Sequence, residues 1–236
     1  MIKNKNIIAV RNLIRTLDIQ SLRNPEVVAN LVRAFGIVQW GPEVFGDEEY
    51  FKNPYPYMAG IYQTPNQISK ALVYLSDMEI NTYLEIGVFQ GGNFLFVSEY
   101  LRRFNPNIRC IGIDPTDFLN DEIKWLIDHE TFISFKSINS DSVIGQEFDL
   151  VFIDGEHTTE WINKDWNNVG KFAKICIIHD IQETTCPDCI EFWNKLRQSK
   201  KKILEFLDYS SKIPTQGIGI IHNQKDLKDQ KGLDNK

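Results

Sequence analysis

The chain has 236 residues, 42% of them hydrophobic and 25% charged, which is ordinary for a globular protein of one α/β domain or at most two small domains. The net charge of −6 disfavours the basic surface that binding to nucleic acid requires. No apolar run approaches the roughly 18 residues of a membrane helix, and residues 1–12 lack the apolar segment and cleavage site of a signal peptide. We therefore expect a cytoplasmic protein that binds neither nucleic acid nor membranes.

Residues 1–63 are expected to form an extension that is first helical and then rich in aromatic residues. Apolar residues recur at helical spacing up to about residue 38, and Asn24 followed by Pro25 is typical of a helix start. Residues 39–63 are rich in Pro, Gly and aromatic residues and follow no period. Such a long irregular segment indicates either a lid or an arm that joins subunits into a homo-oligomer. Irregular packing over a hydrophobic surface is an equally good interpretation.

From Thr64 and Pro65, where a new helix is expected to start, strands and helices alternate as far as residue 222. The predicted strands are 82–86, 108–113, 132–138, 148–153, 174–179, about 203–207 and 217–221, and the predicted helices between them are 92–104, 119–130, 158–169 and 187–199. This alternation predicts an α/β domain with a parallel sheet and helices on both faces. The polar tail, residues 223–236, is predicted to be disordered.

The first strand of this domain leads into a glycine-rich turn, TYLEIGVFQGGN, at residues 82–93. Gly87 and Gly91 let the backbone approach a ligand closely, and the turn aims the start of the next helix at that ligand. A dinucleotide site requires G-x-G-x-x-G, but Val88 stands where the second glycine belongs. The spacing therefore disfavours NAD, and a plain strand–helix turn without a ligand is the simplest alternative.

Ligands of open α/β sheets bind at the carboxyl ends of the strands, so the residues at those ends are candidates for the site. Asp114 ends the second strand, where it could accept hydrogen bonds from both ribose hydroxyls of an adenosine or could cap the next helix. Ser140 and Asp141 follow the third strand and could meet an adenine amino group, although such residues are also common in turns.

The fourth and fifth strands end in FDLVFIDGEH and IIHD. Because neighbouring parallel strands lie about 4.8 Å apart, Asp154, His179 and Asp180 are expected to converge on one point. Two carboxylates suit Mg2+, and the histidine admits Mn2+, Fe2+ or Zn2+ as well. Hydrogen bonding without a metal is the alternative.

The four cysteines do not form a disulfide framework. Cys110 and Cys176 lie in apolar runs and are expected to be buried. Cys186 and Cys189 form a C-x-x-C, which can be half of a zinc site or a redox pair. Pro187 suits the first residue of a helix, and no second C-x-x-C exists, so a structural role is favoured.

Four motifs in this order resemble those of class I S-adenosylmethionine (SAM)-dependent methyltransferases: E-x-G-x-x-x-G at 85–91, I-G-I-D at 111–114, FDLVFIDGxH at 148–157 and IIHD at 177–180. They are similar to the branch that includes macrolide-sugar and cephalosporin-tailoring O-methyltransferases, and more distantly to the metal-dependent catechol and caffeoyl-CoA O-methyltransferases. The likeness spans residues 64–222. It implies a Rossmann-like class I methyltransferase fold with a seven-stranded, mostly parallel sheet, helices on both faces and an antiparallel last strand.

The resemblance also implies roles for single residues. Glu85, Gly87 and Gly91 would hold the methionine part of SAM, and Asp114 would bind its ribose. Asp154 and Asp180 fall on metal-ligand positions, whereas relatives often carry a carboxylate in place of His179. His157 takes the place of the basic residue that deprotonates the acceptor hydroxyl, so His157 and Asp154 are the predicted catalytic residues. Thr159 replaces a frequent aromatic residue.

The predicted function is SAM-dependent methylation of a hydroxyl on a small molecule, such as a sugar or natural-product scaffold, assisted by Mg2+ or another divalent cation. One alternative is a SAM- or nucleotide-binding protein without catalysis. The other alternative is an NAD-dependent enzyme.

Overall fold

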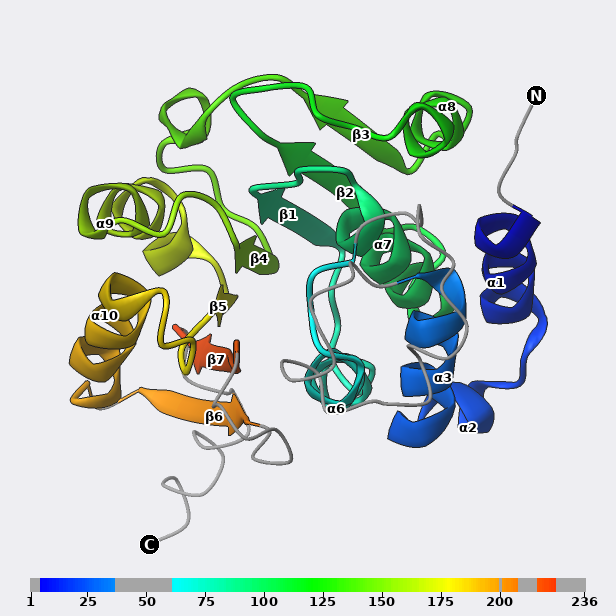
Figure 1. Ribbon diagram of the computed structural model, residues 1–236, viewed down its shortest axis with the longest axis horizontal. Coiled ribbons are helices and arrows are strands. Elements are labelled where there is room, and N and C mark those ends of the chain that lie inside the picture. The colour runs from blue at the N-terminus through cyan, green and yellow to red at the C-terminus, as the bar shows by residue number, and fades with distance from the viewer. Residues whose placement is uncertain (1–4, 37–60, 200, 208–215, 224–236) are drawn as a thin grey trace, which may run out of the picture.

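A seven-stranded sheet forms the centre of the computed structural model, which describes residues 5–36, 61–199, 201–207 and 216–223 (Figure 1). Residues 39–60 of the predicted lid or arm (39–63) and residues 224–236 of the predicted disordered tail (223–236) lie outside the described residues. The strands are β1 (Thr82–Ile86), β2 (Arg109–Ile113), β3 (Ile133–Lys136), β4 (Leu150–Ile153), β5 (Ile175–His179), β6 (Lys202–Phe206) and β7 (Ile218–His222). Each lies within a few residues of a predicted strand.

The helices of the described residues also agree with the sequence pattern. They are α1 (Lys5–Thr16), α2 (Ile19–Leu22), α3 (Pro25–Phe35), α6 (Pro65–Leu75), α7 (Gly92–Phe104), α8 (Asp121–Asp128), α9 (Thr159–Asn168) and α10 (Pro187–Arg197), with 3-10 turns η1 (Ser140–Val143) and η2 (Gly170–Phe172). Asn24 caps α3 as predicted, because its side chain accepts a hydrogen bond from the Glu26 amide. None of the described helices is long and apolar enough to cross a membrane.

The strand order is β3-β2-β1-β4-β5-β7-β6, and all neighbours from β3 to β5 are parallel. Strand β7 is antiparallel to both β5 and β6. This is the fold that the sequence predicts, with its last strand antiparallel. The order of the strands reverses between β1 and β4, so the carboxyl ends of these two strands flank the crevice where such sheets bind ligands.

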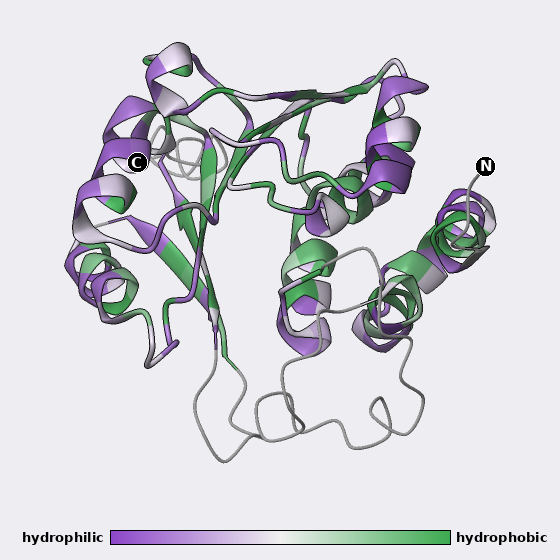
Figure 2. Ribbon diagram, turned by 45° about the horizontal axis from the view of Figure 1, so that its top comes forward, coloured by the Kyte–Doolittle hydropathy of each residue, from purple (hydrophilic) through white to green (hydrophobic). Residues whose placement is uncertain are grey.

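Both faces of the sheet are buried, which explains why the strand sequences are continuously apolar. Side chains alternate between the faces: Tyr83 and Phe152 belong to one hydrophobic cluster, whereas Leu84 and Val151 belong to the other. Helices α9 and α10 cover the second cluster, and α1, α3, α6, α7 and α8 cover the first. Hydrophobic residues accordingly line the inner strands and hydrophilic ones lie on the outer helices (Figure 2).

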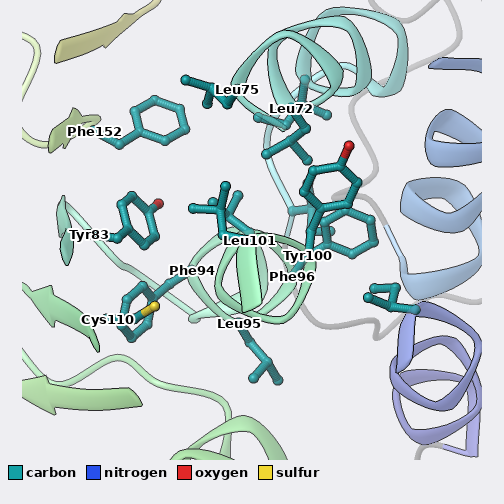
Figure 3. Close-up of a cluster of buried hydrophobic side chains, with 14 of the residues drawn as sticks. Leu72, Leu75, Tyr83, Phe94, Leu95, Phe96, Tyr100, Leu101, Cys110 and Phe152 are labelled. Atoms are coloured by element: carbon teal, nitrogen blue, oxygen red, sulfur yellow. The ribbon is translucent and has the colours of Figure 1, made fainter. Parts of the chain in front are cut away.

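Helix α7 lies between the sheet and the N-terminal helices and is buried almost throughout (Figure 3). Phe94 meets Tyr83 of β1, while Phe96 meets Phe35 of α3 edge to face, with the ring centroids 5.5 Å apart. Tyr100 donates a hydrogen bond to a backbone oxygen of α2. The described part of the N-terminal extension therefore shares one hydrophobic core with the predicted methyltransferase domain.

A buried ion cluster joins α1 to α7. The side chain of Glu99 on α7 is fully buried and accepts hydrogen bonds from Arg11 Nε at 2.7 Å and Arg15 Nη2 at 2.6 Å. Glu130 Oε1 accepts from the same two guanidinium groups. A buried carboxylate is tolerated here only because the two arginines neutralise it and satisfy its lone pairs.

We expect Glu99→Ala to lower the free energy of unfolding by about 3–5 kcal/mol, because it leaves the buried Arg11 without its main partner. Urea titration followed by circular dichroism measures the change. Lys195→Ala is the control, since Lys195 pairs with Glu191 on an exposed helix face and its loss should cost at most about 0.5 kcal/mol. Equal effects of the two substitutions would show that the cluster does not stabilise the fold.

Candidate active site

A cavity of about 930 Å³ opens at the carboxyl ends of the central strands. Its volume is near the upper end of the roughly 300–1,000 Å³ typical of small-molecule sites, so it has room for a cofactor and a small substrate together. The predicted site residues that line it are Glu85, Gly87, Asp114, Ser140, Asp154, His157, His179 and Asp180. Two predicted cofactor-binding residues, Gly91 and Asp141, do not line it.

Gly87 is required where β1 and β4 approach each other at the floor of the cavity. Its φ is +85°, and a Cβ at this position would lie 2.1 Å from the backbone oxygen of Asp154. The backbone on both sides is fixed, because Gly87 N donates to Ile113 O and Asp154 N donates to Ile86 O, both at 2.9 Å. Only glycine combines this conformation with this close approach.

Gly91 and Asp141 have structural partners outside the cavity. Gly91 precedes α7 with a φ of +88°, and a Cβ there would come within 2.7 Å of the Leu119 side chain. Asp141 Oδ2 lies 2.6 Å from Lys164 Nζ, and Asp141 Oδ1 accepts a hydrogen bond from Asn168. The predicted contacts of Gly91 and Asp141 with SAM therefore have no support in the cavity wall.

Asp114 lies at the end of β2 and is held by the backbone. Its Oδ2 accepts from Phe89 N and its Oδ1 from Thr116 N, both at 3.0 Å. Each carboxylate oxygen has a second lone pair, so Asp114 can still accept two further hydrogen bonds from a ligand. The predicted ribose contact thus comes from a preorganised carboxylate.

Glu85 is a buried acid in the cavity wall. Tyr83 Oη and Asn93 Nδ2 both donate to its Oε2. Burial raises the pKa of Glu85 to about 8, more than these hydrogen bonds lower it. A positively charged ligand group beside Glu85 would restore its ionised form, so this corner of the cavity favours a cationic ligand.

Asp154, His179 and Asp180 meet at the ends of β4 and β5. Ile153 and Ile178 are paired in the sheet, which sets Asp154 and His179 side by side one residue later. His179 Nδ1 lies 2.9 Å from Asp154 Oδ1 and 3.2 Å from Asp180 Oδ1. The convergence that the sequence predicts is therefore present.

The carboxylates of Asp154 and Asp180 favour positive charge on or beside His179. Although burial opposes the protonated form, the two carboxylates raise the pKa of His179 well above its usual value. Burial likewise disfavours ionised Asp154, but the neighbouring His179 lowers the pKa of Asp154. Asp180 adopts a φ of +57°, which is uncommon for a residue with a side chain and is typical of functional sites.

His157 faces the same group from the loop after β4. Its Nε2 lies 3.1 Å from Asp180 Oδ2 and 3.9 Å from Asp154 Oδ1. Interaction with Asp154 raises the pKa of His157, burial lowers it, and Asp180 raises it further; the net shift is upward. Its Nδ1 lies 3.1 Å from Cys186 Sγ, a thiol whose pKa burial raises to about 11.

The family model described as a methyltransferase domain matches residues 84–181. This part of the chain is similar to methyltransferase domains, and we name it the methyltransferase domain after this match. It contains all four sequence motifs and ends directly after Asp180. No curated protein shows a significant sequence match to the chain.

Several solved structures share the fold of the methyltransferase domain. O-methyltransferase TomG from Streptomyces achromogenes, involved in tomaymycin synthesis and solved with SAM, has 13% identity and a TM-score of 0.54 over 88% of this chain and 100% of its own. A Bacillus cereus O-methyltransferase solved with S-adenosylhomocysteine (SAH) has 12% identity and a TM-score of 0.53 over 91% of this chain and 97% of its own. N-methyltransferase NodS from Bradyrhizobium japonicum, also solved with SAH, has 14% identity and a TM-score of 0.52 over 78% of this chain and 100% of its own.

The sequence did not single out two polar residues of the methyltransferase domain that also line the cavity, Asn93 and Asp165. Asp165 accepts a hydrogen bond from Ser140 at 2.6 Å, and burial raises the pKa of Asp165 to about 6. It lies on the buried face of α9 with Ile162, and the buried Val169 follows directly after the helix. An acidic residue three positions after Ile162, where the helical pattern calls for an apolar one, is the sequence feature that could have identified Asp165.

The end of the predicted lid or arm also reaches the methyltransferase domain. Gln63 Nε2 donates to Asp154 Oδ2 at 2.5 Å. Gln216, directly before β7, holds this segment, because its Oε1 accepts from Thr64 N and its Nε2 donates to Tyr62 O. These contacts join residues far apart in the chain, so no local pattern predicts them.

We expect Gly87→Ala to destabilise the methyltransferase domain by about 2–5 kcal/mol, because left-handed backbone strain and overpacking act together. Gly145→Ala is the matched control. Gly145 also has a positive φ, +69°, but a Cβ there meets nothing within 4 Å, so only about 1–2 kcal/mol of strain should appear. Thermal and urea unfolding of both variants check the difference, and a Gly87→Ala protein as stable as Gly145→Ala would contradict it.

Proposed function

We propose that the protein is a SAM-dependent O-methyltransferase that acts on a hydroxyl of a small molecule and uses a divalent cation. One observation carries the proposal: buried polar atoms in the cavity wall have no hydrogen-bond partner among the described residues. They are Gln63 Oε1, Asn93 Oδ1 and His179 Nε2. Each such atom costs about 1–3 kcal/mol when left unpaired, so a set of them around one cavity indicates a polar ligand.

The residues around Glu85 fit the amino-acid part of SAM. Asn93 Oδ1 can accept a hydrogen bond from an ammonium group, and Glu85 supplies the opposite charge. Asp114 has acceptors for the two ribose hydroxyls, and apolar side chains of Phe118 and Ile138 line the cavity where the adenine would lie. SAM supplies an electrophilic methyl group, and the protein orients this group toward the acceptor oxygen.

The donor atoms of Asp154, His179 and Asp180 fit a divalent cation. Their ligand atoms all lie within 4.8 Å of one another, and Nε2 of His179 has no hydrogen-bond partner in the described part of the chain. A bound cation would lower the pKa of the acceptor hydroxyl. His157, on the same side of the cavity, would accept the proton through Nε2, and Asp154 and Asp180 would stabilise the resulting imidazolium.

These groups favour transfer to oxygen over transfer to nitrogen. An amine already carries a lone pair in its neutral form, whereas a hydroxyl has to lose a proton before it becomes a strong nucleophile. The site supplies what that step needs, which is a base and a place for a cation. The similar structures include methyltransferases of both kinds, so the assignment to oxygen rests on the site.

We expect the protein to bind SAM and not NAD when the two are titrated in parallel by calorimetry. Asp114→Asn should weaken SAM binding by about 10- to 100-fold, because one carboxylate acceptor for the ribose is replaced by an amide donor. Asp117→Asn is the control, since Asp117 is exposed and pairs with Lys124 outside the cavity. NAD binding without SAM binding would overturn the proposed function.

We expect His157→Ala to slow methyl transfer by about 10²- to 10⁴-fold and to leave SAM affinity unchanged, because His157 contacts the acceptor proton and not the cofactor. A screen of hydroxylated acceptors with and without EDTA provides the assay. His129→Ala is the control, because His129 is exposed, lies outside the cavity, and contacts Trp125 of α8 through its Nδ1 and its ring. Full activity in EDTA would remove the cation from the mechanism, and SAM binding without any transfer would support a non-catalytic protein.

A further inference from the structure

Cys186 has an unexpected partner in the active site. As half of a zinc site or as a redox pair, the C-x-x-C would use Cys186 together with Cys189. In the structure Cys189 is buried against Phe192 and Trp193 in the core, whereas Cys186 lies at the start of α10 and lines the cavity. Its Sγ faces His157 Nδ1 at 3.1 Å, so the thiol belongs to the active site.

Cys186, His157 and Asp180 form a second group of potential metal ligands. One ligand atom of each lies within 4.8 Å of the others, and His157 Nε2 is 3.1 Å from Asp180 Oδ2. Around a tetrahedral zinc ion, ligand atoms are about 3.3–3.8 Å apart. Cys186 Sγ faces Nδ1 of His157, whereas Asp180 Oδ2 faces Nε2, and a single ion takes one of these two nitrogens. The ligand atom that faces the other nitrogen then has to move inward by up to about 1.5 Å from the 4.8 Å limit.

The two ligand groups differ in chemistry and share Asp180. Asp154, His179 and Asp180 offer two carboxylates and an imidazole, a set that accepts hard cations as well as transition metals. The group with Cys186 offers sulfur, nitrogen and oxygen, which suits Zn2+ and is unsuited to Mg2+. An ion in the second group would engage both Asp180 and His157.

We infer that Cys186, His157 and Asp180 bind a thiophilic divalent ion, Zn2+ above all, and that this binding switches methyl transfer off. The thiol releases its proton to solvent as the sulfur–metal bond forms. The ion occupies the nitrogen lone pair of His157, which then cannot accept a proton from the acceptor hydroxyl. Zinc binding stands independently of the proposed function, and only the inhibition rests on it.

Cobalt replaces zinc as a spectroscopic probe of the binding. Co2+ is added to the EDTA-treated, dialysed full-length protein, and a thiolate-to-cobalt charge-transfer band is sought in the near ultraviolet. We expect the band in the unmodified protein and in Cys189→Ser, and its loss in Cys186→Ser. Absence of the band in the unmodified protein, or its persistence in Cys186→Ser, would overturn the site; circular dichroism confirms that both variants fold.

Inhibition is measured in the methyl-transfer assay with Mg2+ present and Zn2+ varied. We expect Zn2+ to inhibit the unmodified protein and Cys189→Ser, and the half-inhibiting concentration to rise at least about 10- to 100-fold in Cys186→Ser, since even an indirect partner of a metal ligand contributes that much. Equal inhibition of all three proteins would overturn the switch. If no acceptor is methylated at all, the proposed function fails, while the cobalt spectrum still decides whether the zinc site exists.

Discussion

The close approach of β1 and β4 at Gly87 and Asp154 is the constraint on which the site depends. A side chain at 87 would have to occupy the space of the Asp154 backbone, so the two strand ends can meet only through glycine. Their meeting brings the predicted cofactor groups, on the β1 side, next to the acid–histidine group on the β4 and β5 side. The same geometry therefore brings the predicted cofactor-binding residues and the predicted catalytic residues into one cavity.

The rest of the fold holds the polar side chains of that cavity in place. Backbone amides fix Asp114, the sheet register fixes Asp154 beside His179, and Gln216 holds the segment that carries Gln63. Groups that are already oriented spend little of the binding free energy on ordering, which is what catalysis by positioning requires. The unpaired polar atoms in the cavity wall lower the stability of the fold, and a ligand that forms hydrogen bonds with them would offset that cost.

The N-terminal helices contribute to the site indirectly. They bury one side of α7, the helix that follows the glycine turn, and Glu99 ties them to it through Arg11 and Arg15. A helix that is apolar on nearly all sides needs such a cover. The extension of the chain thus supports the helix that carries Asn93, and its last described residues, Tyr62 and Gln63, reach the cavity itself.

The sequence by itself determined the class of fold, because periodicity and strand-end residues are local properties, and the motifs around Glu85, Asp114 and Asp154 follow the strands. It also predicted the convergence of Asp154, His179 and Asp180, since strand order and spacing suffice for that. Tertiary structure alone decided that Gly91 and Asp141 lie outside the cavity and that Gln63 and Cys186 lie inside it. Those placements depend on packing between distant segments, which no local pattern encodes.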